Sequence, residues 1–496
     1  MRGFTPRQRL ILALMATAVV AVFGLFGYVV VTTTRQMAAL SPLPSPQPPV
    51  SPLGSPSAAA EAPSPGASTS PTAEPTTAPT PTRAVPLSQI QSARAVHEVA
   101  RILARVRDLP PVEQFPVSFP SEREIALYLL QRYGDIRPQE ALVLYGLLGL
   151  VPRPESLPLP DVTAQAARVF SLYAPAGRQI LLAAGRGPAT PDDELALVHT
   201  LAHALQDNAF GLGEGAEPPR VPLAAACRPT ADAALALRAL VEGDAVLTTA
   251  HYAGVAADPQ EVDRLAGLAA GAEEPTYAPL SNIATFEAIR LFPYRDGARF
   301  VAALYADGGW NAVNRAYAAP PCSTQEILHP ERYRDRRPPL EPAVPDLAPV
   351  LGKGLGPRAL RPEGWSLARR DTVGEFLIGL HLAAYLDDDG AARRAADGWA
   401  GDTFTLWTDE TGREVIVWRL AWESREEAVE FERAYALLVP RFRTPPLVAT
   451  PPPLGLTGRF WSGPAGAAYL SRTGRVVTVV WGPDLETLAS VVPALP

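Results

Sequence analysis

Two histidines in the segment "VHTLAHALQD" have the type and spacing of metal ligands. His199 and His203 stand four residues apart, so on a helix their Cβ atoms lie on one face, about 5–6 Å from each other. Two imidazoles placed in this way can both reach one zinc ion at about 2.0–2.1 Å. The alternative is a pair of helix histidines that make ordinary hydrogen bonds.

A zinc ion that does chemistry needs a third protein ligand, and Glu242 is the best acidic candidate. Gly243 follows it, and a glycine lets another backbone come close at that point. The alternative for Glu242 is an ion pair with Arg238, one turn earlier on the same helix. His251 lies about 180° around an ideal helix from Glu242, so both can face one metal only if the helix bends.

The elements that position these residues have clear sequence signals. The helix around His199 begins with a capping threonine, a proline at the first helical position and two acidic residues that favour the positive end of the helix dipole: Thr190, Pro191, Asp192 and Asp193. Residues 168–185 hold two β-rich runs around a Pro-Ala-Gly turn and predict a hairpin before that helix.

The rest of residues 87–337 is expected to be mainly helical. Apolar periodicity predicts helices at 88–107, 122–133, 138–150, 230–252 and 291–317, the last broken at Gly308-Gly309. Residues 338–364 are proline-rich and are expected to form an interdomain linker.

A different pattern follows in residues 365–496. Helices are expected at 371–386 and 424–438 and after Asp484, with strands at 404–408, 414–420, 456–461, 467–471 and 476–481. Hairpins that alternate with helices predict a small α+β domain with a mostly antiparallel sheet. The expected fold class is therefore α+β: a mainly helical domain with a β-hairpin, followed by this smaller domain.

The N-terminus predicts a membrane anchor and a stalk. Residues 10–31 carry no charge and are long enough to cross a bilayer as a transmembrane helix. Three arginines precede them, which places residues 1–9 in the cytoplasm and the bulk of this single-pass chain outside the cell membrane. The alternative is a cleaved signal peptide, whose apolar part normally spans only about 7–15 residues. Residues 32–86 are rich in Pro, Ser and Thr and predict a disordered stalk.

Charge and cysteine content limit the kinds of ligand and partner that the sequence predicts. The net charge is −7 and no basic run occurs, so nucleic-acid binding has no electrostatic support. Cys227 and Cys322 are the two cysteines; outside the cell they could form a disulfide, or they could be buried thiols. Neither belongs to a C-x-x-C pair, so a cysteine metal site is not expected.

The segment "DDELALVHTLAHALQDNAFGL" resembles the signature "E…HELxHALQDxxFxL" of a group of bacterial zinc metallopeptidases of gluzincin type. Further segments are also similar to that group: "ALVEGDA", "LFPYRDGARFV…GGWNAVNRAY", "PPCSTQEILHPERY" and "GEFLIGL…AADGWAGDTFTLW…AWESREEAVEFERAY". The resemblance covers most of the chain from about residue 90. It implies a zincin-like domain that holds zinc through His199, His203 and Glu242, and a hairpin edge strand beside a cleft for a protein or peptide.

Thr200 departs from the family pattern where the chemistry is done. The family has a glutamate there, which positions and deprotonates the zinc-bound water. A threonine hydroxyl is no general base near pH 7, and loss of general-base catalysis costs about 10²–10⁴-fold in rate. Zinc still lowers the pKa of its water towards about 7, so residual hydrolysis stays open. Glu194 and Asp207 could replace the base only from unsuitable angles on the same helix.

Three further residues have two interpretations each. Tyr294 and His329 match recurrent positions of the family, where either could reach the cleft and stabilise an oxyanion; alternatively both are structural. Asp207 continues the four-residue series from His203, so it either orients the site or lies in solvent.

The sequence therefore supports three hypotheses about function. The first is a membrane-anchored, extracytoplasmic pseudopeptidase, which keeps its zinc ligands, lacks the base and acts as a binding or scaffold module. The second is an active but atypical zinc metallohydrolase with a relocated base. The third is a structural envelope protein that binds no metal.

Overall fold

The computed structural model describes residues 90–135, 138–153, 160–187, 189–212, 227–275, 277, 280, 283–352 and 364–496. All of them belong to the second of two compact units, Ala78–Pro496. The predicted anchor at 10–31 and stalk at 32–86 lie outside the described residues. Within the described ranges, no helix combines the length and the apolar character that a bilayer crossing requires.

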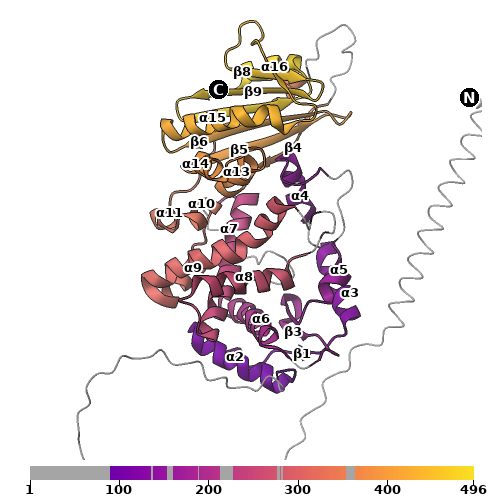
Figure 1. The fold of residues 1–496 in the computed structure, drawn as a ribbon, viewed down its shortest axis with the longest axis vertical. Helices are drawn as coiled ribbons and strands as arrows, with labels where there is room; N and C mark the ends of the chain where they lie inside the picture. The colour runs from indigo at the N-terminus through magenta and orange to yellow at the C-terminus, as the bar shows by residue number, and fades with distance from the viewer. Residues whose placement is uncertain are drawn as a thin grey trace, which may run out of the picture. The chain divides into compact units, whose positions relative to one another are not determined.

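Residues 90–335, here called the helical region, contain ten helices in their described part and one small sheet (Figure 1). The helices are α2 (Ala93–Arg107), α3 (Glu122–Asp135), α4 (Pro138–Leu147), α5 (Val162–Ala166), α6 (Pro191–Phe210), α7 (Ala231–Ala253), α8 (Pro259–Glu273), α9 (Ala284–Ala318), α10 (Thr324–Leu328) and α11 (Pro330–Asp335). The sheet has the order β1-β3-β2, from β1 (Val117–Ser118), β2 (Ser171–Ala174) and β3 (Gln179–Leu182).

The elements around the histidine pair form as predicted. Strands β2 and β3 make the antiparallel hairpin, closed by a short 3₁₀ turn at Pro175–Gly177. Thr190 caps α6 in a reciprocal capping box with Asp193, and Gly211 ends the helix in the left-handed conformation. Helix α9 is non-helical at Gly308 and Gly309, which confirms the predicted break.

Helix α7 is the centre of the helical region. Every residue from Ala239 to Ala250 is buried, so the helix is surrounded on all sides. It crosses α9 backbone to backbone: a Cβ at Gly243 would lie 2.1 Å from the carbonyl carbon of Gly297, and a Cβ at Gly297 would lie 2.1 Å from the oxygen of Ala239. The expectation that Gly243 lets another backbone approach is confirmed.

Residues 338–352 and 364–496, here called the sheet region, form a seven-stranded antiparallel sheet with the order β4-β5-β6-β10-β9-β8-β7. Its strands are β4 (Ser366–Asp371), β5 (Trp399–Thr408), β6 (Glu414–Trp422), β7 (Val448–Thr450), β8 (Arg459–Gly463), β9 (Gly466–Thr473) and β10 (Val476–Gly482). Its helices are α12 (Ala348–Leu351), α13 (Gly374–Ala383), α14 (Asp389–Ala396), α15 (Arg425–Phe442) and α16 (Leu485–Val491). The predicted antiparallel α+β arrangement is confirmed.

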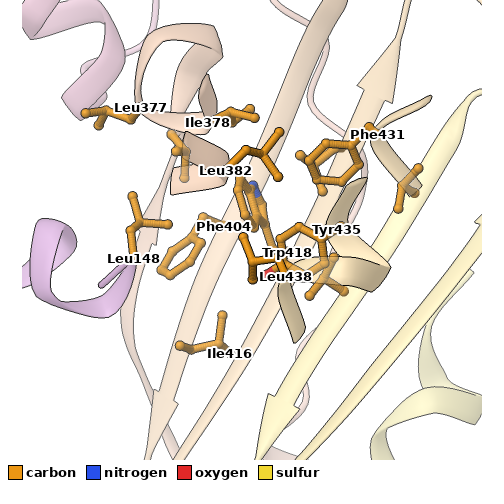
Figure 2. Close-up of a cluster of buried hydrophobic side chains, with 14 of the residues drawn as sticks. Leu148, Leu377, Ile378, Leu382, Phe404, Ile416, Trp418, Phe431, Tyr435 and Leu438 are labelled. Carbon is orange, nitrogen blue, oxygen red and sulfur yellow. The ribbon is translucent and has the colours of Figure 1, made fainter. Parts of the chain in front are cut away.

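Both faces of this sheet are covered. Alternate residues of β6 enter different cores: Ile416 and Trp418 pack with residues of α13 and α15, as Figure 2 shows, whereas Val415 and Val417 pack with residues of α12 and α16. Burial on both faces explains why β6 is apolar almost throughout.

Two sequence expectations need correction here. Residues 366–371 form β4, which was not predicted, and the helix expected at 371–386 starts only at Gly374, because the segment pairs with β5 far along the chain. The predicted linker at 338–364 also packs on the sheet in its described part. Leu340 N donates to Ala400 O at 2.8 Å, and Leu347 is fully buried.

The start of α7 joins the helical region to the sheet region. Asp232 is fully buried and accepts hydrogen bonds from Thr324 N and Oγ1. Ala231 N donates to Asp371 Oδ1 at 2.7 Å. Cys227 and Cys322 form a disulfide beside these contacts, so of the two possibilities for the cysteines the structure has the bond.

The glycine contact between α7 and α9 leads to a stability prediction. Gly243→Ala should lower the free energy of unfolding by about 1–3 kcal/mol, because the added methyl group overlaps the α9 backbone. Gly267→Ala in α8 is the matched control: its Cβ meets nothing within 4 Å, and helix propensity should raise stability by up to about 1 kcal/mol. Urea denaturation of both variants measures the difference. Equal effects would contradict the backbone contact.

Candidate metal centre

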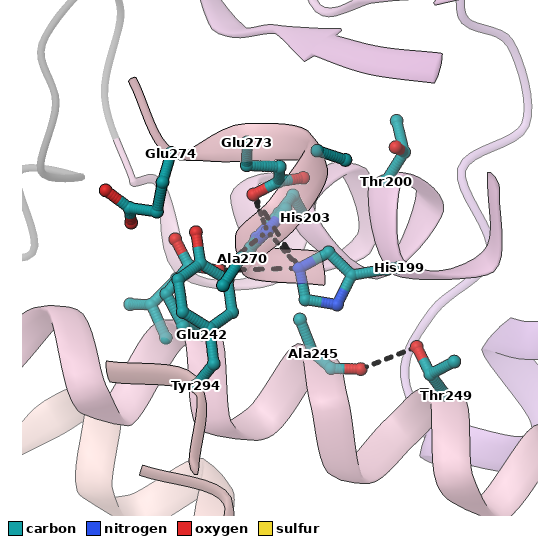
Figure 3. Close-up of polar contacts among 12 residues, drawn as sticks. His199, Thr200, His203, Glu242, Ala245, Thr249, Ala270, Glu273, Glu274 and Tyr294 are labelled. Atoms are coloured by element: carbon teal, nitrogen blue, oxygen red, sulfur yellow. Dashed lines mark hydrogen bonds and ion pairs between the residues drawn. The ribbon is translucent and has the colours of Figure 1, made fainter. Parts of the chain in front are cut away.

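The histidine pair and Glu242 come together as expected. On α6, the Nε2 atoms of His199 and His203 lie 3.2 Å apart. Glu242 projects from α7, and its Oε2 lies 3.4 Å from Nε2 of His199 and 3.3 Å from Nε2 of His203 (Figure 3). Three of the sequence-predicted residues therefore converge on one point between two helices.

A fourth residue, Glu273, was not predicted. It is the last residue of α8, and its Oε2 lies 3.7 Å from Nε2 of His199 and 3.5 Å from Nε2 of His203. The four ligand atoms all lie within 4.8 Å of one another, so the group could hold a metal ion. The start of α8 has a recognisable signal, the N-cap Asp258 before Pro259, but nothing local marks Glu273 as a ligand.

The group is nearly closed off from solvent, and its imidazoles and carboxylates each stabilise the charged form of the other. His199 is 4 % exposed and Glu242 is 5 % exposed. Burial acts to lower the pKa of each imidazole, but the carboxylates of Glu242 and Glu273 outweigh it and raise the pKa of both histidines. Burial likewise acts to raise the pKa of both glutamates, and the histidines reverse this. Two carboxylates thus favour two positive charges, which a divalent cation could supply.

The distances fit a central cation better than a set of hydrogen bonds. Charge-assisted hydrogen bonds between nitrogen and oxygen are about 2.7–2.9 Å long. The four carboxylate-to-imidazole distances are all longer, from 3.3 to 3.7 Å. Oε2 of Glu242 is buried and has no hydrogen-bond partner among the described residues, although both imidazoles face it. A metal ion at the centre would satisfy this atom.

Gln206 fixes the orientation of His203. Its side-chain Nε2 donates to Val241 O at 3.0 Å and to Asp244 Oδ2 at 3.1 Å, and both of these atoms are acceptors. The carbonyl Oε1 must therefore face Nδ1 of His203, at 2.9 Å, and accept its proton. In neutral His203 this leaves the lone pair of Nε2 directed at the group, which is the tautomer of a metal ligand.

Asp244 is the support behind Gln206. It is fully buried on α7 and forms a two-bond ion pair with Arg107 of α2, at 2.7 and 3.0 Å. Tyr317 of α9 donates to the same carboxylate at 2.7 Å. Helices α2, α6, α7 and α9 are thus connected through one carboxylate, which also holds the amide that orients His203.

Thr200 faces away from the two histidines' meeting point. Its Oγ1 lies 2.9 Å from Oγ of Ser171 on β2, and the side chain is buried between α6 and the hairpin. In Figure 3 it points to the side opposite Glu242. Threonine at this position therefore fastens the helix to β2.

The two predicted substitutes for the base are engaged elsewhere. Glu194 accepts a hydrogen bond from Tyr252 OH at 2.9 Å. Asp207 accepts one from Tyr173 OH at 2.6 Å and is buried, so it neither orients the two histidines nor lies in solvent. The hydrogen-bond partner of Asp207, Tyr173, lies on the hairpin, so helix spacing alone could not identify it.

The other residues singled out in the sequence do not belong to the four-residue group. Tyr294 is fully buried, with its ring centre 6.1 Å from that of His199 and its hydroxyl 3.5 Å from Nη2 of Arg238. Arg238 lies 3.9 Å from Glu242 but contacts Glu274 more closely, so the alternative ion pair of Glu242 is only a weak one.

His329 and His251 belong to other surroundings. His329 Nε2 contacts Glu375 Oε1 at 2.7 Å, with the exposed Asp397 at 3.8 Å, and so joins the helical region to the sheet region. These three residues form a second group of possible metal ligands, but the short distance is that of a hydrogen bond. His251 packs against Trp310 and is not part of the group formed by His199, His203, Glu242 and Glu273, as the helix geometry predicts.

Removing the carbonyl that orients His203 should weaken metal binding. We expect Gln206→Leu to reduce the affinity for Co²⁺ or Zn²⁺ by about 10–100-fold, because the ring loses the acceptor that holds its tautomer. Asn208→Leu, an exposed amide on the same helix, should leave the affinity unchanged. Competitive titration against a chelator measures both. An unchanged affinity in Gln206→Leu would refute this support role.

Comparison with known proteins reaches only the sheet region. Residues 365–492, from just before β4 to α16, match the family described as "Domain of unknown function (DUF8575)". No curated protein and no solved structure matches the chain. The sheet region therefore resembles a family to which no activity is attached, and the function has to be argued from the metal group itself.

Proposed function

We propose that the protein binds one zinc ion through His199, His203 and Glu242 and acts as a pseudopeptidase, a binding or scaffold module without efficient hydrolysis. The observation that carries the proposal is the spacing of the three ligand atoms, 3.2, 3.3 and 3.4 Å. Tetrahedral ligands about 2.0–2.1 Å from zinc must lie about 3.3–3.4 Å from one another. The side chains are already spaced for this ion.

The types of ligand also favour zinc. Imidazole suits zinc and other first-row transition metals, whereas magnesium and calcium prefer oxygen ligands alone. Zinc accepts both imidazole and carboxylate in a tetrahedral arrangement. Bound here, zinc would hold its ligand helices together. The chain itself contributes burial, the fixed tautomer of His203 and the negative charges of Glu242 and the neighbouring Glu273.

The surroundings of Thr200 support a pseudopeptidase over an active hydrolase. A general base has to lie within hydrogen-bonding distance of the proton that it removes. Thr200 is bonded to Ser171, and the carboxylates of Glu194 and Asp207 are bonded to tyrosines. The two relocated bases that the sequence suggests are therefore both engaged away from the two histidines.

The location that we propose is the outer face of the cell membrane, with residues 10–31 as the anchor. The disulfide between Cys227 and Cys322 supports an extracytoplasmic setting, since such bonds persist in oxidising compartments. In this setting the chain would present its zinc-stabilised helical region and its sheet region to a protein or peptide partner.

Metal analysis tests the proposal. The purified full-length chain should retain about one zinc per molecule after dialysis, because three ligands are already positioned. His203→Ala should lose it, whereas His97→Ala, which removes a histidine bonded to backbone carbonyls, should keep it. Failure of the unaltered chain to bind zinc at saturating metal would reject the proposal. Strong chelator-sensitive hydrolysis of casein would favour the active hydrolase instead.

A further inference from the structure

We infer that Glu273 is a fourth protein ligand, which closes the coordination of the metal and makes the site structural rather than catalytic. The inference rests on the proposed function, since it concerns the ion that His199, His203 and Glu242 hold. Structural zinc sites have four protein ligands, whereas catalytic sites keep one position open for water.

The carboxylate of Glu273 lies at the distance from the imidazoles that a metal ligand would have. Its Oε2 lies 3.5 and 3.7 Å from the two imidazole Nε2 atoms, close to the 3.3 and 3.4 Å of Glu242. A carboxylate that acted as a base would lie one hydrogen bond, about 2.6–3.2 Å, beyond a metal-bound water. It would then be clearly further from the imidazoles than Glu242 is. Glu273 therefore occupies the coordination position that a catalytic site would leave open for water.

The charges balance with four ligands. Two neutral imidazoles and two carboxylates carry two negative charges, which one divalent cation neutralises. Burying an ionised carboxylate without a counter-charge is costly, and the side chains of Glu242 and Glu273 are only 7 % and 13 % exposed. With both imidazoles neutral, as metal ligands are, the two carboxylates together need the full charge of one divalent ion.

The chain around Glu273 holds it in place. On one side, Gln165 of α5 donates from Nε2 to the backbone oxygens of Ala272 and Glu273, at 3.3 and 3.0 Å. On the other side, Glu274 is paired with Arg238 of α7. The end of α8 is thus fixed before any ion binds, with the Glu273 carboxylate among the imidazoles.

Among the described residues, one small cavity touches a member of the group, His199. The cavity that touches His199 has a volume of about 10 Å³ and is lined mainly by apolar residues of α6, α7 and α8. Such a volume holds at most about one water molecule. A larger cavity of about 410 Å³ lies along α8, but none of the four ligand residues lines it. A closed site that fastens α8 to α6 and α7 accounts for both observations.

Cobalt substitution in the full-length protein tests the inference. Four-coordinate Co²⁺ absorbs visible light more strongly than five- or six-coordinate Co²⁺, and azide alters the spectrum only if a position is open. We expect the unaltered protein to give the intense four-coordinate spectrum and not to respond to azide. Glu273→Ala and the isosteric Glu273→Gln should both respond to azide. Both should also lose more affinity than the about 10–100-fold typical of residues that only support a ligand.

Glu261→Gln is the matched control, because it changes a carboxylate on α8 that pairs with Arg264 at the surface. It should keep the spectrum and the affinity of the unaltered protein. If the unaltered protein binds Co²⁺ and responds to azide just as Glu273→Gln does, the inference is wrong while the proposed function stands. If the unaltered protein binds neither Co²⁺ nor Zn²⁺, the proposed function itself fails. Circular dichroism of each variant separates loss of a ligand from loss of folding.

Discussion

Two carboxylates and two imidazoles share one point between α6, α7 and α8, and the surrounding structure depends on how their charge is compensated. Glu242 is buried and Glu273 is half-buried, and each lies within 3.7 Å of the same two nitrogens. Without a cation, compensation requires protons on both imidazoles, whose Nε2 atoms are only 3.2 Å apart. A divalent ion at this point would replace this repulsion with four attractive contacts, and so would connect three helices through a single centre.

The rest of the helical region sets the positions of these four groups. The close crossing of α7 and α9 at Gly243 and Gly297 fixes the position of α7, and with it the position of Glu242. Asp244, one residue further, uses its carboxylate to hold Gln206, which directs the lone pair of His203. Thr200 fastens α6 to the hairpin through Ser171, where a peptidase of the resembling type would carry its base. The residue that stands in place of the glutamate of that family pattern therefore contributes to packing.

Local patterns predict those parts of the site that lie within one element. The spacing of the histidines, the capped start of α6, the hairpin and the glycine after Glu242 are all short-range features, and the structure has each of them. Glu273 could not be predicted in this way, because α8 ends in two adjacent glutamates. Only the packing of α8 decides that Glu273 meets the imidazoles while Glu274 meets Arg238. Likewise β4 and the packed segment before it depend on pairing with β5, which no local pattern shows.

The location of a bound ion is the most direct test of this account. Diffraction from zinc-loaded crystals, measured at the zinc absorption edge, locates the metal without reference to any assumed ligand. The account predicts one anomalous peak among His199, His203, Glu242 and Glu273, with a carboxylate oxygen of each glutamate in contact with it. The absence of a peak there, or a peak found only beside His329 and Glu375, would contradict it.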